Sequence, residues 1–177
     1  MKTKGQVLAQ RAIGRAGSSL YFIEDILRHR GDSTDTAYSR FWYILLSFNF
    51  ELILNALIAF ESKGATNEEV IKDIMRVKPP HDFEKLFKNI SPELLTKVGF
   101  VSVKKQNNGG FIEYEVIVNG DKKIYAQDLI DVRYDFKKDK TRKLDPQEIP
   151  RIKNELQLLK SVVDNITRLV WVDQLEA

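Results

Sequence analysis

Hydrophobic residues recur at helical spacing over two long stretches near the ends of the chain. The first stretch runs from about residue 5 to residue 30, and Gly31 follows it as a stop signal. Its recurring apolar positions are Leu8, Ala12, Ile13, Leu20, Ile23, Ile26 and Leu27. In the last stretch they are Ile152, Leu156, Leu159, Val162, Val163, Ile166, Leu169 and Val170. Because this period matches one face of an α-helix, we predict an amphipathic helix over each stretch.

Between them, the segment from about Phe41 to Phe60 is apolar almost without interruption. Asp32–Asp35 offers N-caps for a helix that runs to about Lys63. The segment is about as long as a membrane-spanning helix requires. It contains Glu51 near its middle, however, and a carboxylate there costs roughly 2.5–3.5 kcal/mol on membrane-insertion scales. We therefore predict a buried core helix and no membrane association.

Short helices should follow, separated by chain breakers. Thr66–Glu69 has the pattern of a capping box and opens a predicted helix that ends near Arg76. Pro79–Pro80 interrupts the chain, and helical spacing resumes over His81–Phe87, where we expect His81 to cap the helix. Ser91–Pro92 predicts another helix start, with proline at the first helical position.

The pattern changes to that of strands between residues 100 and 126. Three short runs, Phe100–Lys105, Phe111–Val118 and Lys122–Ala126, are rich in residues that favour strands. Gln106–Gly110 and Asn119–Asp121 separate them and carry strong turn signals. We predict a small antiparallel hairpin or three-stranded meander here.

The remaining segments complete the predicted fold. Gln127–Phe136 is interpreted as a further short helix, Lys137–Lys143 as a charged loop and Asp145–Glu148 as the cap of the last helix. No repeat or long linker divides the chain. The sequence therefore predicts one domain over residues 1–177, a mainly α, up-and-down helical bundle with a small antiparallel β insertion around residues 100–126.

Composition excludes several functional classes. The 177 residues contain no cysteine, which rules out a disulfide scaffold, a thiol nucleophile and a thiolate zinc site. The two histidines leave little material for a metal centre, so we expect neither a metal nor a cofactor. The N-terminus has no apolar run behind its positive charges, as a signal peptide would, and we expect a cytoplasmic protein. A net charge of +3 permits nucleic-acid binding without requiring it.

A polar stripe interrupts the apolar central helix. Ser47, Glu51 and Asn55 follow one another at four-residue steps and therefore share one face. Either this face meets solvent, or Glu51 is partly buried and pairs with a cation. Arg133 is the best candidate cation, because it sits among apolar and aromatic neighbours and its planar guanidinium suits a buried carboxylate. We predict a structural ion pair that joins Glu51 and Asn55 to Arg133.

Three segments, Phe48–Ile58, His81–Phe87 and Val132–Tyr134, together resemble the HEPN superfamily over about residues 40 to 170. The resemblance implies an all-α domain that typically forms dimers. Many members are metal-independent ribonucleases, or RNA-binding parts of toxin–antitoxin and anti-phage systems. We accordingly expect a homodimer, RNA as a ligand and a partner protein from such a system.

The catalytic signature of that superfamily is an arginine followed by four to six residues and a histidine. The resemblance implies that the histidine transfers protons and the arginine stabilises phosphate charge. Arg133 occupies a plausible arginine position, but Lys137–Lys140 contains no histidine. Arg76 and His81 have the required spacing, with two prolines between them. The candidate catalytic residues are therefore Arg133, His81 and Glu51, in an incomplete arrangement.

Basic residues gather in and after the predicted strands, with tyrosines among them. The candidate RNA-binding residues are Lys104, Lys105, Lys122, Lys123, Tyr134, Lys137, Lys138 and Arg142; Tyr114 and Tyr125 are also interleaved. Such residues can bind phosphates and stack bases. The alternatives are a solvated charged surface that protects a sheet edge, or an edge that pairs with a partner.

These patterns lead to one functional hypothesis and two alternatives. We expect a HEPN-like, RNA-associated binding or regulatory protein of a toxin–antitoxin or anti-phage defence system that lacks complete catalytic equipment, and the sequence leaves open whether it is an enzyme. The first alternative is an active metal-independent endoribonuclease using Arg133 and a histidine. The second is a helical protein–protein adaptor with no nucleic-acid role.

Overall fold

The computed structural model describes residues 2–30, 36–77, 81–108, 111–127 and 148–172. About 70% of the described residues are helical, and they form six helices and a three-stranded antiparallel sheet inserted mid-chain. The predicted fold class, a helical bundle with a small β insertion, is confirmed.

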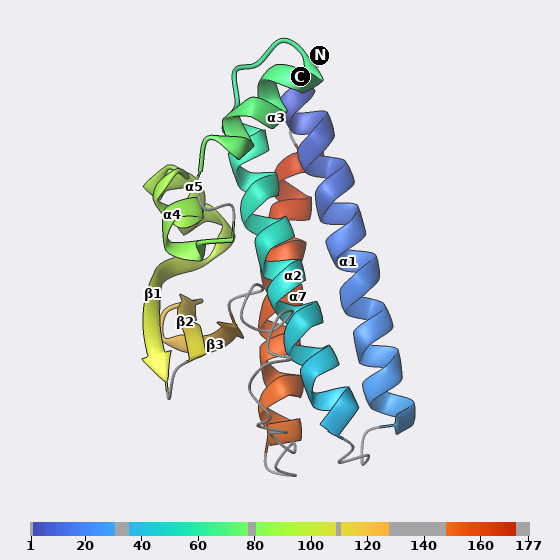
Figure 1. Ribbon diagram of the computed structural model, residues 1–177. Helices are drawn as coiled ribbons and strands as arrows, with labels where there is room; N and C mark the ends of the chain where they lie inside the picture. Colours follow the sequence, from blue (N-terminus) through green and yellow to red (C-terminus); the bar gives the residue numbers. More distant parts are fainter. Residues whose placement is uncertain (1, 31–35, 78–80, 109–110, 128–147, 173–177) are drawn as a thin grey trace.

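Three long helices form the body of the molecule. They are α1 (Lys4–Arg30), α2 (Thr36–Glu61) and α7 (Glu148–Val172), and they lie side by side along the long axis (Figure 1). Helix α1 runs in the opposite direction to α2 and α7, as in an up-and-down bundle. All three helices contribute fully buried residues to the core: Ala9, Ala16, Leu20 and Ile23 of α1, Phe50, Ile53 and Leu57 of α2, and Leu159 and Val162 of α7.

The apolar character of α2 follows from its position, since it packs against α1, α3, α4, α7 and β3. By length and composition alone, Ile44–Glu61 would be long and apolar enough to cross a membrane, a test that core helices of bundles also pass. In this fold 56% of that segment is buried inside the protein. Burial against neighbours on several sides explains why few charged residues interrupt this helix.

Short helices connect the bundle to the sheet. In α3 (Asn67–Met75) the Thr66 side chain accepts from the backbone N–H of Glu69, while the Glu69 carboxylate binds back to Thr66. This confirms the predicted capping box. Helix α5 (Pro92–Val98) begins after Ser91, whose hydroxyl accepts from the Leu94 N–H, with proline at its first position as predicted. It ends at Gly99, where φ is 91° and a side chain would be strained.

The predicted cap of the next helix was wrong by one residue. Helix α4 spans Phe83–Lys88, and its N-cap is Asp82, whose carboxylate accepts from the Lys85 backbone N–H at 3.2 Å. His81 therefore does not cap this helix. An aspartate is the better cap, since its short anionic side chain reaches the exposed N–H groups of the first turn and complements the helix dipole.

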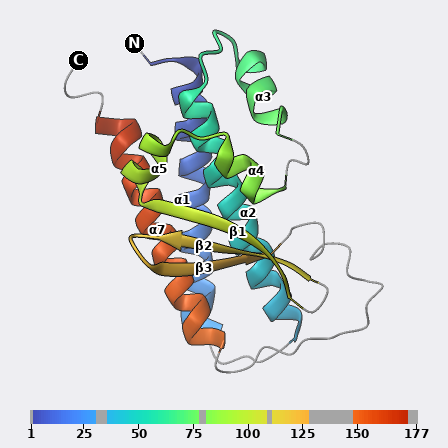
Figure 2. The same cartoon turned by 90° about the vertical axis from the view of Figure 1, so that its left-hand side faces the viewer.

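The inserted sheet is a meander in the order β1-β2-β3. Its strands are β1 (Phe100–Asn108), β2 (Phe111–Val118) and β3 (Lys122–Gln127), and both pairings are antiparallel. Figure 2 shows the sheet lying across one side of the bundle, with β1 nearest α4 and α5. Strand β1 has no second strand partner among the described residues, so one of its edges is open to other contacts.

Two strand boundaries differ from the prediction. Gln106, Asn107 and Asn108 were predicted as part of a turn, but they extend β1 and pair with Glu113, Ile112 and Phe111. Gln127 was assigned to a helix and instead ends β3 opposite Glu113. In both places cross-strand pairing outweighs the local preference of the side chains.

An aromatic cluster joins the sheet to the bundle. Phe83 of α4 lies between Phe50 of α2, at 5.0 Å between ring centroids, and Tyr114 of β2, at 4.7 Å. Phe100 of β1 also contacts the Phe50 ring, edge to face at 5.8 Å. These rings anchor the start of α4 against α2, and thereby place the residues before α4 next to the polar stripe of α2.

Several predictions fall outside the described residues. They concern the caps at Asp32–Asp35, the helix proposed for residues 128–136, the loop Lys137–Lys143 and the cap at residues 145–147. They stay predictions.

Candidate functional site

The polar stripe of α2 is not a solvent-facing surface. Ser47 is fully buried, and the Glu51 side chain is 16% exposed. Asn55, one turn further along, is half-buried, and its Oδ1 atom is buried without a hydrogen-bond partner in the described part of the chain. A buried acceptor without a hydrogen bond destabilises a fold, so the polar groups on this face of α2 lower the stability of the protein.

Glu51 meets His81 across the junction between α2 and α4. The Oε2 atom of Glu51 lies 2.8 Å from Nδ1 of His81, whose side chain is 26% exposed. The aromatic contact between Phe50 and Phe83 holds the two segments together, because each ring is close in sequence to one member of the pair. Sequence analysis named both residues as catalytic candidates, but it assigned Arg133 rather than His81 as the partner of Glu51.

The contact fixes the chemistry of the imidazole ring. A carboxylate accepts hydrogen bonds, so Nδ1 carries the proton in this contact and Nε2 of the neutral ring is an acceptor. A histidine oriented in this way can accept a proton or bind a group through Nε2. Such a carboxylate–imidazole pair is the arrangement that orients a histidine in many sites, and it also serves as a structural contact.

Arg133, the predicted partner of Glu51 and Asn55, lies outside the described residues, as do Tyr134, Lys137, Lys138 and Arg142. Their roles stay predictions. Arg76, the other arginine with suitable spacing to a histidine, follows α3 and points its guanidinium to Asp73, 3.1 Å away. It is 79% exposed, so its ion pair is a local surface contact.

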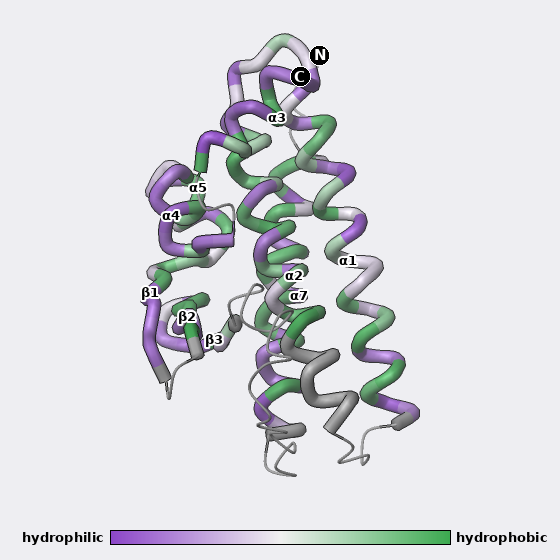
Figure 3. The backbone as a smooth tube through the Cα atoms, in the orientation of Figure 1, coloured by the Kyte–Doolittle hydropathy of each residue, from purple (hydrophilic) through white to green (hydrophobic). Residues whose placement is uncertain are grey.

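Lysines border the His81 site on one side. Lys85 of α4 and Lys105 of β1 each place Nζ 4.0 Å from the carboxylate of Asp82, which is almost buried. Glu84 accepts a hydrogen bond from the Lys105 backbone N–H at 2.8 Å and so occupies part of the open edge of β1. Figure 3 shows that hydrophilic residues predominate along β1 and alternate with hydrophobic ones in α4. Lys88 of α4 and Lys104 of β1 are also exposed. We call Lys85 and Lys105, which share the Asp82 carboxylate, the α4–β1 lysines.

The predicted basic surface is divided between two faces of the sheet. Lys105 stands opposite Tyr114, whereas Lys104 stands opposite Glu115 on the other face. Lys123 binds Glu115 at 3.0 Å, and this hydrogen bond lowers the pKa of the glutamate and raises that of the lysine. The charge of Lys123 is therefore matched locally, as expected of a solvated sheet face.

The tyrosines of the strands offer little surface for stacking. Tyr114 is fully buried and packs on Phe83, so it cannot stack on a base. The Tyr125 ring is covered on one side by the guanidinium of Arg151, 4.4 Å from the ring centroid. The expectation that these tyrosines stack bases is wrong for Tyr114 and stays a prediction for Tyr125.

A buried charged cluster between α7 and the sheet was missed. Glu155 of α7 is 1% exposed and accepts a hydrogen bond from Nε of Arg151 at 2.8 Å. Arg151 also lies 3.7 Å from Glu113 of β2. Burial raises the pKa of the Glu155 carboxyl, while Arg151 opposes the rise. The sequence does contain a signal for this cluster: Glu155 is a charged residue on the apolar face of the helix, between Ile152 and Leu159.

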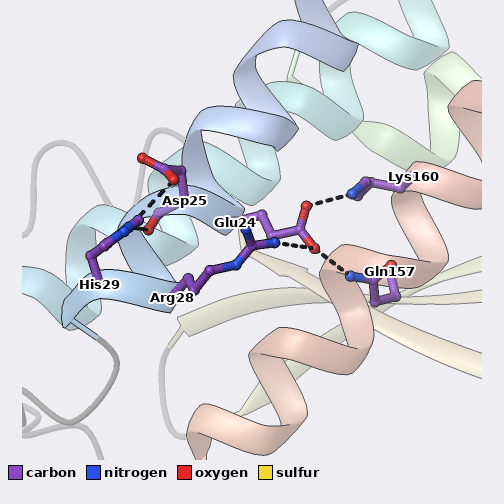
Figure 4. Close-up of polar contacts among 6 residues, drawn as sticks. All are labelled: Glu24, Asp25, Arg28, His29, Gln157 and Lys160. Carbon is purple, nitrogen blue, oxygen red and sulfur yellow. Dashed lines mark hydrogen bonds and ion pairs between the residues drawn. The ribbon is translucent and has the colours of Figure 1, made fainter.

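A second cluster joins α1 to α7 (Figure 4). Glu24 of α1 accepts hydrogen bonds from Lys160 at 2.6 Å and Gln157 at 3.0 Å, both on α7. The bond to Lys160 lowers the pKa of Glu24. A shallow pocket of about 210 Å³ lies beside it, lined by Glu24, Leu27, Arg28, Lys153, Leu156 and Gln157. This volume is smaller than that of the pockets that usually bind metabolites. The polar side of the pocket includes Glu24, which is already engaged by Lys160.

Nothing in the described part of the chain gathers three or more histidine, aspartate or glutamate side chains in a manner suited to a metal ion. In comparisons with known proteins, no family model, no curated protein and no solved structure matches this chain. Function must therefore be argued from the geometry of these residues.

Proposed function

We propose that this chain is a HEPN-like, RNA-associated binding or regulatory protein of a toxin–antitoxin or anti-phage defence system. It acts in the cytoplasm as a homodimer or as a subunit with a partner protein. The observation that supports this best is the position of His81, held by Glu51 and bordered by the α4–β1 lysines. The ammonium groups suit a phosphate group of RNA, and Nε2 of the neutral imidazole, an acceptor, suits a ribose hydroxyl.

RNA binding is favoured over RNA cleavage because the site contains a single histidine, the side chain that most often acts as general acid or base. Attack by a ribose hydroxyl needs a base for that hydroxyl and an acid for the leaving oxygen. The chain has only two histidines, and the second, His29, sits at the end of α1 beside Asp25. His81 therefore has no histidine partner within its own subunit.

The experiment is a titration of labelled single-stranded RNA with protein in EDTA at increasing salt. We expect salt-sensitive binding, since neutralised phosphates release counterions. Changing Lys85→Glu and Lys105→Glu together should weaken binding at least about tenfold and reduce the salt slope by about 1.4, at about 0.7 per lost phosphate contact.

The matched control is Lys72→Glu with Lys153→Glu, which changes the net charge equally at exposed positions on α3 and α7. The control should bind nearly as well as the unchanged protein. Equal loss in both double variants would show a general charge effect and contradict the assignment of the site.

An active ribonuclease is the second candidate, and the Glu51–His81 contact favours it. A carboxylate that orients an imidazole at 2.8 Å is a common feature of acid–base catalysis. This candidate predicts RNA cleavage in EDTA that disappears in both His81→Ala and Arg133→Ala. Bound but intact RNA after long incubation contradicts it and leaves the binding proposal standing.

A further inference from the structure

The charges of α1 are strongly segregated along the chain. Residues 1–23 contain four basic residues, Lys2, Lys4, Arg11 and Arg15, and no aspartate or glutamate. The first acids are Glu24 and Asp25, near the other end of the helix. The first turn of α1 contains no acidic residue either, although acids are favoured at that end.

Three of these basic residues form a line along the exposed side of α1. Lys4, Arg11 and Arg15 are separated by seven and four residues, so they lie nearly above one another, and Phe22 continues the line after another seven. All four side chains are exposed, Phe22 by 59%. At 1.5 Å per residue the line is about 27 Å long. We call Lys4, Arg11 and Arg15 the α1 basic stripe.

The charges of the stripe are not matched by the protein. Within the part of the chain that the structure describes, no hydrogen bond, ion pair or ring contact engages the side chains of Lys4, Arg11 or Arg15. The acids of the same helix are engaged elsewhere: Glu24 binds Lys160 of α7, and Asp25 lies 3.3 Å from His29 (Figure 4).

This arrangement does not stabilise the helix. Lys4 stands at the N-terminal end, where the helix dipole disfavours a cation. Arg11 and Arg15 are like charges one turn apart and repel each other. Gly14, beside them, has open space where its side chain would be. A row of unmatched cations on an uncrowded helix face is the arrangement that a polyanion neutralises.

We infer that the α1 basic stripe binds the phosphate backbone of RNA, with the exposed Phe22 ring as a stacking surface for a base. This inference rests on the proposed function and adds a second surface, on the side of the bundle away from the sheet (Figure 1). A membrane surface fits less well, because the apolar face of α1 is buried: Ala9, Ile13, Ala16 and Leu20 are at most 2% exposed.

The test is the RNA titration of a double variant that carries both Arg11→Glu and Arg15→Glu. Its matched control is the double variant Lys72→Glu, Lys153→Glu. The stripe variant should bind at least about tenfold more weakly, with a salt slope reduced by about 1.4. Arg11→Lys with Arg15→Lys keeps the charge and should retain binding. Phe22→Ala should weaken binding severalfold and leave the salt slope unchanged, because it removes stacking alone.

The outcomes separate the two proposals. RNA binding by the stripe variant equal to that of the control overturns the inference and leaves the proposed function intact. Absence of RNA binding by the unchanged protein contradicts both. Binding to phosphatidylserine vesicles that requires Arg11 and Arg15, without RNA binding, also overturns the inference. Thermal unfolding of each variant shows whether a loss of RNA binding reflects misfolding. We expect the variants to fold normally, because the substituted side chains are exposed.

Discussion

At the scale of single residues, the most consequential contact is the one between Glu51 and His81. Sequence patterns identified both side chains but could not pair them, because thirty residues and a double proline separate them along the chain. Packing of the Phe50 and Phe83 rings brings them together. The distance of 2.8 Å makes Glu51 the group that sets which imidazole nitrogen carries the proton.

The contact predicts the tautomer of His81. In the neutral ring we expect the proton on Nδ1, since the carboxylate of Glu51 accepts it. Nitrogen-15 NMR of the imidazole should show this form, and Glu51→Ala should shift it toward a mixture of both tautomers. His29, whose ring lies against Asp25, serves as the internal control and should not change. A tautomer mixture already present in the unchanged protein would contradict the contact.

Glu155 predicts a pH dependence of stability. Burial raises the pKa of its carboxyl above the ordinary value of 4.5. The folded protein then binds this proton more tightly than the unfolded chain does, so the contribution to stability is present below about 4.5 and is lost as pH rises through the folded pKa.

We therefore expect Glu155→Gln to gain stability relative to the unchanged protein as pH increases from about 4.5 toward neutrality. Urea unfolding at several pH values measures the difference in unfolding free energy between the two proteins. The contributions of the other titrating groups cancel, because both proteins contain them. Arg151 keeps a carboxylate partner in Glu113 in this variant. A constant difference between the two proteins at all pH values would show that folding does not raise the pKa of Glu155.

At the scale of elements, local signals predicted helix starts well and ends of strands poorly. Thr66 and Ser91 cap their helices as expected, because a cap needs only the side chain and the next three residues. The end of β1 was missed, since Gln106, Asn107 and Asn108 favour turns locally but pair with β2. Pairing depends on the partner strand, which a local pattern does not contain.

The cap of α5 predicts a measurable stability change. Ser91 accepts from the Leu94 N–H, and its own N–H and hydroxyl both donate to the Glu61 carboxylate of α2. Ser91→Ala removes the cap and one partner of Glu61, so we expect a loss of about 1–2 kcal/mol in unfolding free energy. Ser18→Ala, at an exposed position of α1, should change it by less than about 0.5 kcal/mol. Equal effects would contradict the bridging role.

At the scale of the whole molecule, the bundle and the sheet form one structure through aromatic packing. The sequence predicted the mainly α bundle and the β insertion from periodicity alone. It did not predict which faces meet, because Arg151 and Glu113, or Phe83 and Tyr114, are brought together only by the folded chain. The same limit applies to the α1 basic stripe, whose isolation from acids is a property of the packed helices.

Because the aromatic cluster joins the sheet to the bundle, we expect the two parts to unfold together. Phe50 is fully buried and contacts the rings of both Phe83 and Phe100. We expect Phe50→Ala to cost about 3–5 kcal/mol, because it leaves a cavity among α2, α4 and β1. Chemical denaturation followed by tryptophan fluorescence and by circular dichroism should give one shared transition. A loss below about 1 kcal/mol would show that the junction contributes little.

The claim on which the functional account depends is that this protein binds RNA through its exposed basic side chains. The most direct measurement is the affinity of the unchanged protein for a labelled single-stranded RNA in EDTA at about 50 and 200 mM salt. We predict a complex at the lower salt and at least about tenfold weaker binding at the higher salt, as several phosphate contacts require. No complex at micromolar protein in the lower salt would contradict the account.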